Sequence, residues 1–372
     1  SLLKINDTGF SFRLGKAMIP KTKIRLKVIK PAQTDPPLEG DDAYWDVVNC
    51  RMLKQSRVKF DEGWYMIRAS FEQKLGDQHG ILQIIQPENY VANSDGGFFK
   101  ADKDSLLGSF VGCFVCNNPE IRFYVLHSKS MLIDQNIFGV PSYTRSAGKL
   151  AYCDYNLIKV ASCSKCGFSS DQKEHFKRLE ADKPTFSVEQ FSTGWDEKIS
   201  PLLKKAQESA DKYYGEDRDT TLGKLSYELA IATFEQLASI TPDIQKKVEV
   251  LRKQSSMQLT LSELEMENKE RDAAETRLNK VVDIWVPVFE NLKGTVMIHV
   301  CLLLFQINIY FNDLQSAAQY MKFMDNYDPD GKLVEGTEEF KAFKLSAAKL
   351  KATFDDRAIL TKENMKHFHL DD

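Results

Sequence analysis

The chain of 372 residues is 42% hydrophobic and 28% charged, with a formal net charge of −3 at pH 7 and an isoelectric point near 6.1. This length suffices for two or three domains that each bury a core, and the composition excludes a fibre or a largely disordered chain. The small negative charge argues against a protein that coats nucleic acid with its whole surface, so any anion-binding site must be local.

Two halves of different character follow one another along the chain. Before about residue 185, apolar and polar residues alternate in short stretches such as KIRLKVI, GSFVGCFV and NLIKVAS, which indicates β-strands. Beyond it, Gly and Pro become scarce and apolar residues recur every three or four positions, which indicates α-helices. We therefore expect an α+β multidomain protein with a β-rich N-terminal half and an all-α C-terminal half.

A short basic stretch, KTKIRLKV, places four cationic residues at every second position: Lys21, Lys23, Arg25 and Lys27. In a β-strand this spacing puts all four on one face. Two interpretations stay open. In one, the basic face binds an anion such as nucleic acid, a nucleotide second messenger or an acidic partner. In the other, the lysines protect a solvated edge strand from aggregation.

Two CxxC motifs, CFVC and CSKC, supply the thiol pairs that a tetrahedral metal site needs: Cys113, Cys116, Cys163 and Cys166. Structural zinc takes four such ligands, commonly from two short turns. Asn117 and Gly167 follow the two motifs, and these residue types adopt the left-handed conformation of such a turn most readily. The 46 residues between the motifs are enough for several strands. The spacing predicts a closed structural Zn²⁺ site in a zinc ribbon.

Two other chemistries compete for these cysteines. A thioredoxin-like oxidoreductase uses a single CxxC at the start of a helix, whereas neither motif here precedes a clear amphipathic helix. A catalytic zinc site keeps one position for water, which four cysteines would close.

The remaining cysteines, Cys50, Cys153 and Cys301, have no partner spacing and are expected to be buried small side chains. An odd total of seven cysteines does not suit a disulfide-bonded secreted protein. The start of the chain also lacks the continuous apolar stretch of a signal peptide. We therefore expect a reducing, cytoplasmic location.

The stretches CFVCNNPEIRFYVLHSKSMLIDQN and YCDYNLIKVASCSKCGFSSDQKEHFKRL, with the helical region that follows them, resemble a bacterial family of uncharacterised proteins. The similarity covers residues 108–325 and includes both CxxC motifs, the Asp154–Tyr155 pair and Phe176. Members of the family carry a split four-cysteine zinc ribbon fused to tetratricopeptide-like helices. Together with the change of character near residue 185, the resemblance implies a β-rich domain at 1–107, the zinc ribbon at 108–185 and a tetratricopeptide-like domain at 186–372.

Two segments of the helical half match the pattern of a tetratricopeptide unit, which has a small residue at the helix crossing, an aromatic near the end of the second helix and a proline after it. The matching residues are Ala230, Phe234 and Pro242 in the first segment and Leu304, Ala317 and Pro329 in the second. The alternative is an irregular bundle in which these side chains simply pack. Helical hairpins usually hold another protein on a concave face, so we expect a protein partner there.

Local signals place individual helices. Thr241, Pro242 and Asp243 predict a helix start with Thr241 as the N-cap and Pro242 at the first helical position, and a long hairpin is expected to continue from there to Trp285. The apolar run Val296 to Phe311 is too short to span a bilayer and contains polar residues, so we expect a buried core helix and no membrane span.

No catalytic motif is present in the sequence: GxSxG, a phosphate-binding glycine loop and HExxH are absent, and the six histidines lie in unrelated surroundings. We predict a non-catalytic adaptor or scaffold with a structural zinc ion and a helical protein-binding surface. The alternatives are an anion-binding module that uses the basic strand and a CxxC thiol oxidoreductase.

Overall fold

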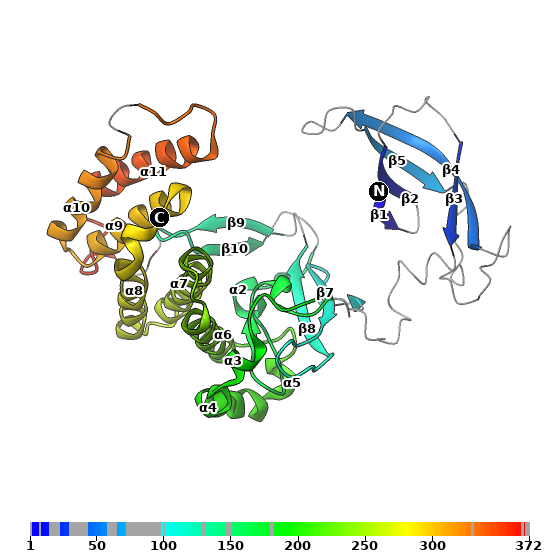
Figure 1. Cartoon of the computed structure of the whole chain (residues 1–372), viewed down its shortest axis with the longest axis horizontal. Helices are drawn as coiled ribbons and strands as arrows, with labels where there is room; N and C mark the ends of the chain where they lie inside the picture. Colours follow the sequence, from blue (N-terminus) through cyan, green and yellow to red (C-terminus); the bar gives the residue numbers. More distant parts are fainter. Residues whose placement is uncertain are drawn as a thin grey trace. The chain divides into compact units, whose positions relative to one another are not determined.

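The computed structural model divides the chain into two compact units, Ser1–Asn93 and Ser94–Asp372 (Figure 1). In the second unit the structure describes residues 98–99, 101–127, 131–145, 150–178, 182–328, 331–365 and 368, and in the first it describes the backbone of five strands. The predicted boundaries at residues 107 and 185 both fall inside the second unit, and the division into three domains stays a prediction.

The first unit contains a five-stranded antiparallel sheet. Its strands are β1 (Leu2–Asn6), β2 (Gly9–Leu14), β3 (Lys23–Ile29), β4 (Tyr44–Arg57) and β5 (Tyr65–Phe71), in the spatial order β1-β2-β5-β4-β3. Strands β3, β4 and β5 follow one another in the chain and pair as consecutive neighbours. The last of them, β5, also pairs with the earlier strand β2, which makes a Greek key arrangement. The predicted basic strand is β3, which lies at an edge of this sheet and pairs with β4 alone among the described strands.

Short strands form the first part of the second unit. A three-stranded antiparallel sheet consists of β6 (Phe98–Phe99), β7 (Leu106–Val111) and β8 (Ile121–Leu126). Two separate hairpins follow, β9 (Met131–Gln135) with β10 (Pro141–Arg145) and β11 (Ala161–Ser162) with β12 (Ser169–Ser170), and the short helix α2 (Tyr155–Ile158) lies between them in sequence.

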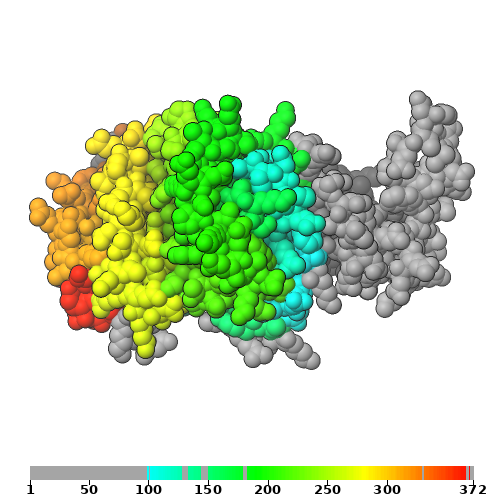
Figure 2. Space-filling model, turned by 90° about the horizontal axis from the view of Figure 1, so that it is seen from below, coloured from blue at the N-terminus to red at the C-terminus, as the bar shows by residue number. Residues whose placement is uncertain are grey.

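Helices form the rest of the second unit, which confirms the predicted α+β class. They are α3 (Val188–Ser192), α4 (Trp195–Glu208), α5 (Ala210–Tyr213), α6 (Thr220–Ile240), α7 (Ile244–Glu267), α8 (Arg271–Trp285), α9 (Gly294–Tyr310), α10 (Leu314–Asp325) and α11 (Glu338–Asp355), with 3₁₀ turns at η3 (Lys173–His175) and η4 (Val286–Asn291). Neighbouring helices pack as α6 on α7 and α7 on α8, while α10 and α11 both pack on α9. Figure 2 shows the colours following one another in sequence order across this unit.

The long hairpin and the core helix are confirmed as α7–α8 and α9, but the predicted start of α7 is wrong. Asp243 is the N-cap, and its carboxylate accepts a hydrogen bond from the Lys246 N–H at 2.9 Å. Thr241 instead ends α6, and its hydroxyl donates to the Leu237 carbonyl at 2.7 Å. Both residue types suit an N-cap, so the backbone path between the helices decides which one caps. None of the helices in the described part of the chain is long and apolar enough to cross a membrane.

One hydrophobic core contains residues from both sides of residue 185. It joins the cysteine-bearing strands to helices α3 to α7 through buried aromatic side chains, among them Phe168, Phe176, Phe191, Trp195 and Phe234. Phe168 makes edge contacts with Phe176 and Phe191 at centroid distances of 5.5 and 5.4 Å. Because each of these rings buries a large apolar area, the strands and the first helices depend on each other for their core.

The β9–β10 turn enters the second core, which the later helices build. Phe138 and Val140 of the turn are buried beside α9 and the end of the described chain. Asn136 fixes the turn, because its side-chain oxygen accepts hydrogen bonds from the N–H groups of Phe138 and Val140 at 3.0 Å each. Its amide donates to Glu263 on α7 at 2.6 Å, which ties the hairpin to the helices.

Arg218 connects the strands to the helices from a fully buried position. Its guanidinium donates to the carbonyl oxygens of Val160 at 2.7 Å, of Leu157 at 3.5 Å and of Tyr213, and it lies over the Tyr213 ring at 4.8 Å. Burial lowers the pKa of Arg218, and the neighbouring tyrosines oppose that shift. A buried cation is costly to leave without its hydrogen-bond acceptors. Arg218 therefore holds the connection between α5 and α6 against the segment from α2 to β11.

Lys159 is a second buried cation at the same junction. Its ammonium donates to the Thr260 hydroxyl on α7 at 3.3 Å and lies 5.6 Å from the centre of the Tyr227 ring. Burial lowers the pKa of Lys159 to about 8, although Asp171 and Asp154 favour the charged form. Below this pH the folded protein contains a charged amine that would be better solvated in the unfolded chain, and this lowers the free energy of unfolding.

We expect Lys159→Met to stabilise the protein at neutral pH. Between about pH 8 and pH 10.5 the unfolded chain keeps a proton that folded Lys159 has released, so stability of the native protein rises with pH in this window. Since one pH unit corresponds to about 1.4 kcal/mol, the variant gains up to roughly 3 kcal/mol at pH 7 and progressively less at higher pH.

Urea unfolding of both proteins across this pH range measures the effect. Lys280→Met, which removes an exposed lysine from α8, serves as the control and should leave the pH profile unchanged. A variant with the same slope as the native protein between pH 8 and pH 10 would contradict the burial argument.

Candidate metal centre

The first CxxC motif forms the turn of the β7–β8 hairpin. The strands pair up to Val111 opposite Ile121, and Cys113 and Cys116 lie in the connection. Two backbone hydrogen bonds shape this turn: Asn117 N–H donates to the Cys113 carbonyl at 3.0 Å, and Cys113 N–H donates to the Asn118 carbonyl at 2.8 Å. Asn117 is left-handed with φ of 56°, as the sequence indicated.

The second motif repeats this geometry in the β11–β12 hairpin. Gly167 N–H donates to the Cys163 carbonyl at 2.9 Å, and Cys163 N–H donates to the Phe168 carbonyl at 2.9 Å. Gly167 has φ of 70°, matching Asn117 of the first turn. Two local sequences therefore fold into the same thiol-presenting turn, which we call a knuckle.

The two knuckles meet, so that all four sulfur atoms lie within 4.8 Å of one another. The Sγ atoms of Cys113 and Cys166 are 3.5 Å apart, and those of Cys116 and Cys163 are 3.4 Å apart. Both close pairs therefore join one knuckle to the other. These separations are far longer than a disulfide bond of about 2.05 Å, and all four cysteines are free.

The sulfur spacing fits a metal ion at the centre of the cluster. With metal–sulfur bonds of about 2.3 Å, a tetrahedral Zn²⁺ site separates its sulfurs by about 3.8 Å, close to the distances between these four. Within the described residues, no histidine, aspartate or glutamate joins the group. The cluster therefore offers four soft ligands and no open position for water.

The thiol pKa values show why the cluster suits a cation. Hydrogen bonding to Cys113 and Cys166 lowers the pKa of Cys163 to about 2. Hydrogen bonding to Cys163 raises the pKa of Cys113, and contacts with Cys113 and Cys163 raise that of Cys166. One thiolate thus forms easily while its neighbours retain their protons. A divalent ion would stabilise four thiolates together and release those protons.

Neighbouring side chains hold the knuckles in place. The Asn118 side-chain amide lies 3.6 Å from the Cys163 sulfur and 3.3 Å from the Ser164 hydroxyl, so it bridges the two turns. The buried Trp195 indole donates to the Cys166 carbonyl at 2.7 Å, and the Gln207 side-chain amide donates to the Ser164 carbonyl at 3.1 Å. Helix α4, which carries Trp195 and Gln207, therefore packs directly against the second knuckle.

Sequence reasoning found the four cysteines but missed these supporting residues. Asn118, Trp195 and Gln207 belong to no motif, and their roles depend on how α4 returns to the hairpins. The only residue near the motifs that indicated a close neighbour was Gly167, because the missing side chain leaves room for Ile199 of α4.

Among the described residues, the predicted cysteines Cys153 and Cys301 do not belong to the cluster. Cys153 and Cys301 are buried, as expected, and burial raises their pKa values to about 11 and about 12. Cys50 lies in β4, whose side chains are outside the described residues. Of the basic stretch, Lys23, Arg25 and Lys27 lie in β3 while Lys21 falls outside the described residues.

Comparison with known proteins returns no match: no family model, no curated protein sequence and no solved structure is similar to this chain. The resemblance to a bacterial zinc-ribbon family therefore stays a prediction.

We expect Gly167→Ala to destabilise the second knuckle by more than the strain of placing alanine in a left-handed conformation, because the added methyl group would also clash with α4. An alanine Cβ at this position would lie 2.9 Å from Cγ1 of the buried Ile199. Gly194, with the same φ of 70° and no atom within 4 Å of an added Cβ, provides a matched control. Both alanine variants should lose about 1–2 kcal/mol from left-handed strain, and Gly167→Ala a further 1–3 kcal/mol, on the order of typical overpacking costs.

Chemical unfolding of the two variants, together with the rate at which a chelator removes bound metal, measures the difference. Faster metal loss is expected for Gly167→Ala alone. Equal destabilisation of the two variants would show that the approach of α4 does not constrain the knuckle.

Proposed function

We propose that the protein is a non-catalytic adaptor in which a structural zinc ion, bound by Cys113, Cys116, Cys163 and Cys166, orders a platform for a helical protein-binding surface. The observation that carries the proposal is the meeting of two equivalent knuckles with four free sulfurs and no open ligand position. A closed set of four thiolates is the usual donor set of structural zinc.

The burial of the cluster favours a structural role over thiol redox chemistry. Cys113 and Cys163 are fully buried, Cys166 is 8% exposed and Cys116 is half-buried. Of the four thiols only Cys116 therefore has partial access to the disulfide substrate that an exchanging thiol must reach. The close sulfur contacts also join the two motifs, while an oxidoreductase forms its disulfide within one CxxC pair. A zinc ion at this position would hold the β7–β8 and β11–β12 hairpins together.

Zinc binding would contribute to folding because the β11–β12 hairpin is short. Strands β11 and β12 have two residues each, which is too few for an independent hairpin. Structural zinc supplies on the order of 10–16 kcal/mol in small zinc domains. The ion would thereby fix the second knuckle against α4 and support the core that these elements share with α6.

The partner surface is proposed on the helical half, around α11. Large apolar side chains are exposed there that the fold itself does not use, including Val334 at 67%, Leu345 at 59% and Ile359 at 54%. Helices α10 and α11 both pack on α9, and we propose that they act as tetratricopeptide-like hairpins. Exposed apolar residues on such helices are typical contact points for another protein.

The basic edge strand supports a second candidate, an anion-binding module. Lys23, Arg25 and Lys27 alternate along β3 at the sheet edge. A polyanion affinity that falls steeply with salt, and that is lost when these three residues are changed to Gln, would favour this function over the adaptor.

Metal analysis tests the structural zinc site. We expect one zinc ion per chain in protein purified without chelator, and no fast-reacting thiol among the four cysteines until a chelator is added. Cys166→Ser should lose the metal and melt at a lower temperature, because three ligands remain for a site that needs four. Cys153→Ser, which removes a buried cysteine outside the cluster, should keep its zinc. Iron in place of zinc, or unchanged metal content in Cys166→Ser, would refute the assignment.

Affinity capture from the native source tests the partner surface. Leu345→Glu on α11 should abolish retention of a stoichiometric partner, since a buried carboxylate opposes an apolar contact. Ile133→Glu on β9, at the same 59% exposure, should leave it intact. Equal retention by both variants, or no partner retained by the native protein, would argue against an adaptor surface at α11.

A further inference from the structure

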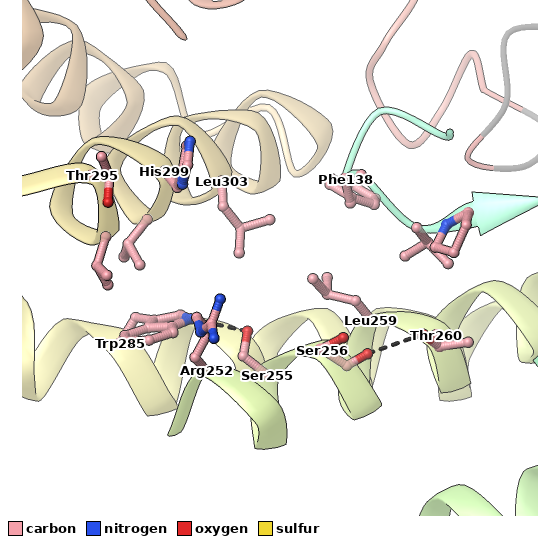
Figure 3. Close-up of a pocket in the computed structure, with 15 residues that line it drawn as sticks. Phe138, Arg252, Ser255, Ser256, Leu259, Thr260, Trp285, Thr295, His299 and Leu303 are labelled. Carbon is pink, nitrogen blue, oxygen red and sulfur yellow. Dashed lines mark hydrogen bonds between the residues drawn. The ribbon is translucent and has the colours of Figure 1, made fainter. Parts of the chain in front are cut away.

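A cavity of about 310 Å³ opens between α7, α9 and the β9–β10 turn. In Figure 3, Ser255, Ser256 and Leu259 of α7 face His299 and Leu303 of α9, and Phe138 closes one end. None of the four clustered cysteines lines this cavity. It is therefore a feature separate from the metal centre.

The cavity has an apolar interior. Phe138, Val140, Leu259, Val300 and Trp285 are all less than 10% exposed and line it. The Trp285 indole is already satisfied, because its N–H donates to the Ser255 hydroxyl at 2.9 Å. These walls would bury an apolar group without leaving a polar atom unpaired.

The rim of the cavity is polar and basic at one end. Arg252, Ser256 and His299 are exposed there, and Figure 3 places Arg252 beside Trp285, at the end away from Phe138. The 15 lining residues include no aspartate or glutamate. The cavity therefore joins an apolar body to a cationic mouth.

The charges at the mouth leave capacity for one anionic group. Arg252 uses Nε and Nη2 to bind Glu249 at 3.1 and 2.9 Å, which leaves its Nη1 group for a ligand. Burial lowers the pKa of His299, and the nearby Lys349 and Arg252 lower it further. An anion bound at Arg252 and His299 would favour the protonated form of His299 and oppose this lowering.

We propose that this cavity binds a small monocarboxylate whose apolar body has about ten non-hydrogen atoms. The size follows from the cavity volume, because one water molecule occupies roughly 30 Å³ and small-molecule sites begin at about 300 Å³. The carboxylate lies at Arg252 and His299, and the apolar body extends toward Leu259, Leu303 and Phe138.

A single negative charge fits this mouth better than a phosphate does. Glu249 already neutralises part of the Arg252 charge, so the remaining positive potential is modest. A doubly charged phosphate calls for several convergent donors, such as an arginine cluster or backbone N–H groups at a helix start, and the described lining shows one arginine. A neutral ligand would make no charge-assisted hydrogen bond with the Nη1 group of Arg252.

Calorimetric titration of the full-length protein with decanoate tests the proposal. Decanoate should bind, while decanol at the same concentrations should bind at least tenfold more weakly because it lacks the charge. Arg252→Gln should weaken decanoate binding about tenfold or more, as expected for loss of a charge-assisted hydrogen bond. Ser256→Trp, which places a large side chain at the exposed rim, should block binding altogether.

Lys280→Gln is the matched control, because Lys280 forms an exposed pair with Asp283 three residues away on α8, as Arg252 does with Glu249 on α7. It should bind decanoate like the native protein. Equal affinity for decanol and decanoate, or unchanged binding in Arg252→Gln, would overturn the proposal. A short peptide with an apolar residue at its free carboxyl end that binds where decanoate does not would also overturn it, and would assign the cavity to a protein terminus.

Discussion

The second unit depends on four sulfur atoms from two distant turns lying within 4.8 Å of one another. Once Cys163 is ionised, the pKa values of Cys113 and Cys166 are raised, so a cation would be needed to stabilise all four thiolates together. Each knuckle forms the turn of a hairpin, and α4 is held to the second knuckle by a hydrogen bond from the Trp195 indole. The cluster thus brings the two hairpins together, and α4 packs against the second of them.

Buried polar contacts also fix the position of the strands on the helical half. Arg218 binds carbonyl oxygens of the α2–β11 segment, and Lys159 reaches Thr260 on α7. Asn136 ties the β9–β10 turn to Glu263 of the same helix. These groups are expensive to bury without partners. They therefore allow few alternative dockings of the strands on α6 and α7.

A four-cysteine cluster that could hold a metal ion and a separate cavity give the unit two different candidate sites. Three of the four cluster cysteines are buried and Cys116 is half-buried, which suits a structural role, while the cavity between α7 and α9 is open and has a basic mouth. Both use α-helices as walls, but they lie on different elements: α4 supports the knuckles, and α7 with α9 lines the cavity.

The sequence by itself determined the features that arise from nearby residues. The CxxC spacing with Asn117 and Gly167 predicted both knuckles, the period-two pattern predicted β3, and apolar periodicity predicted the α7–α8 hairpin and the buried helix α9. Such signals are local, because a turn or an amphipathic face needs only a few neighbouring residues. Only the tertiary structure decided that Asp243 rather than Thr241 caps α7. It also decided that Trp195 supports the metal centre, that Lys159 and Arg218 are buried, and that Arg252 and His299 share a cavity. These roles depend on which elements meet in space, and no pattern within one segment records that.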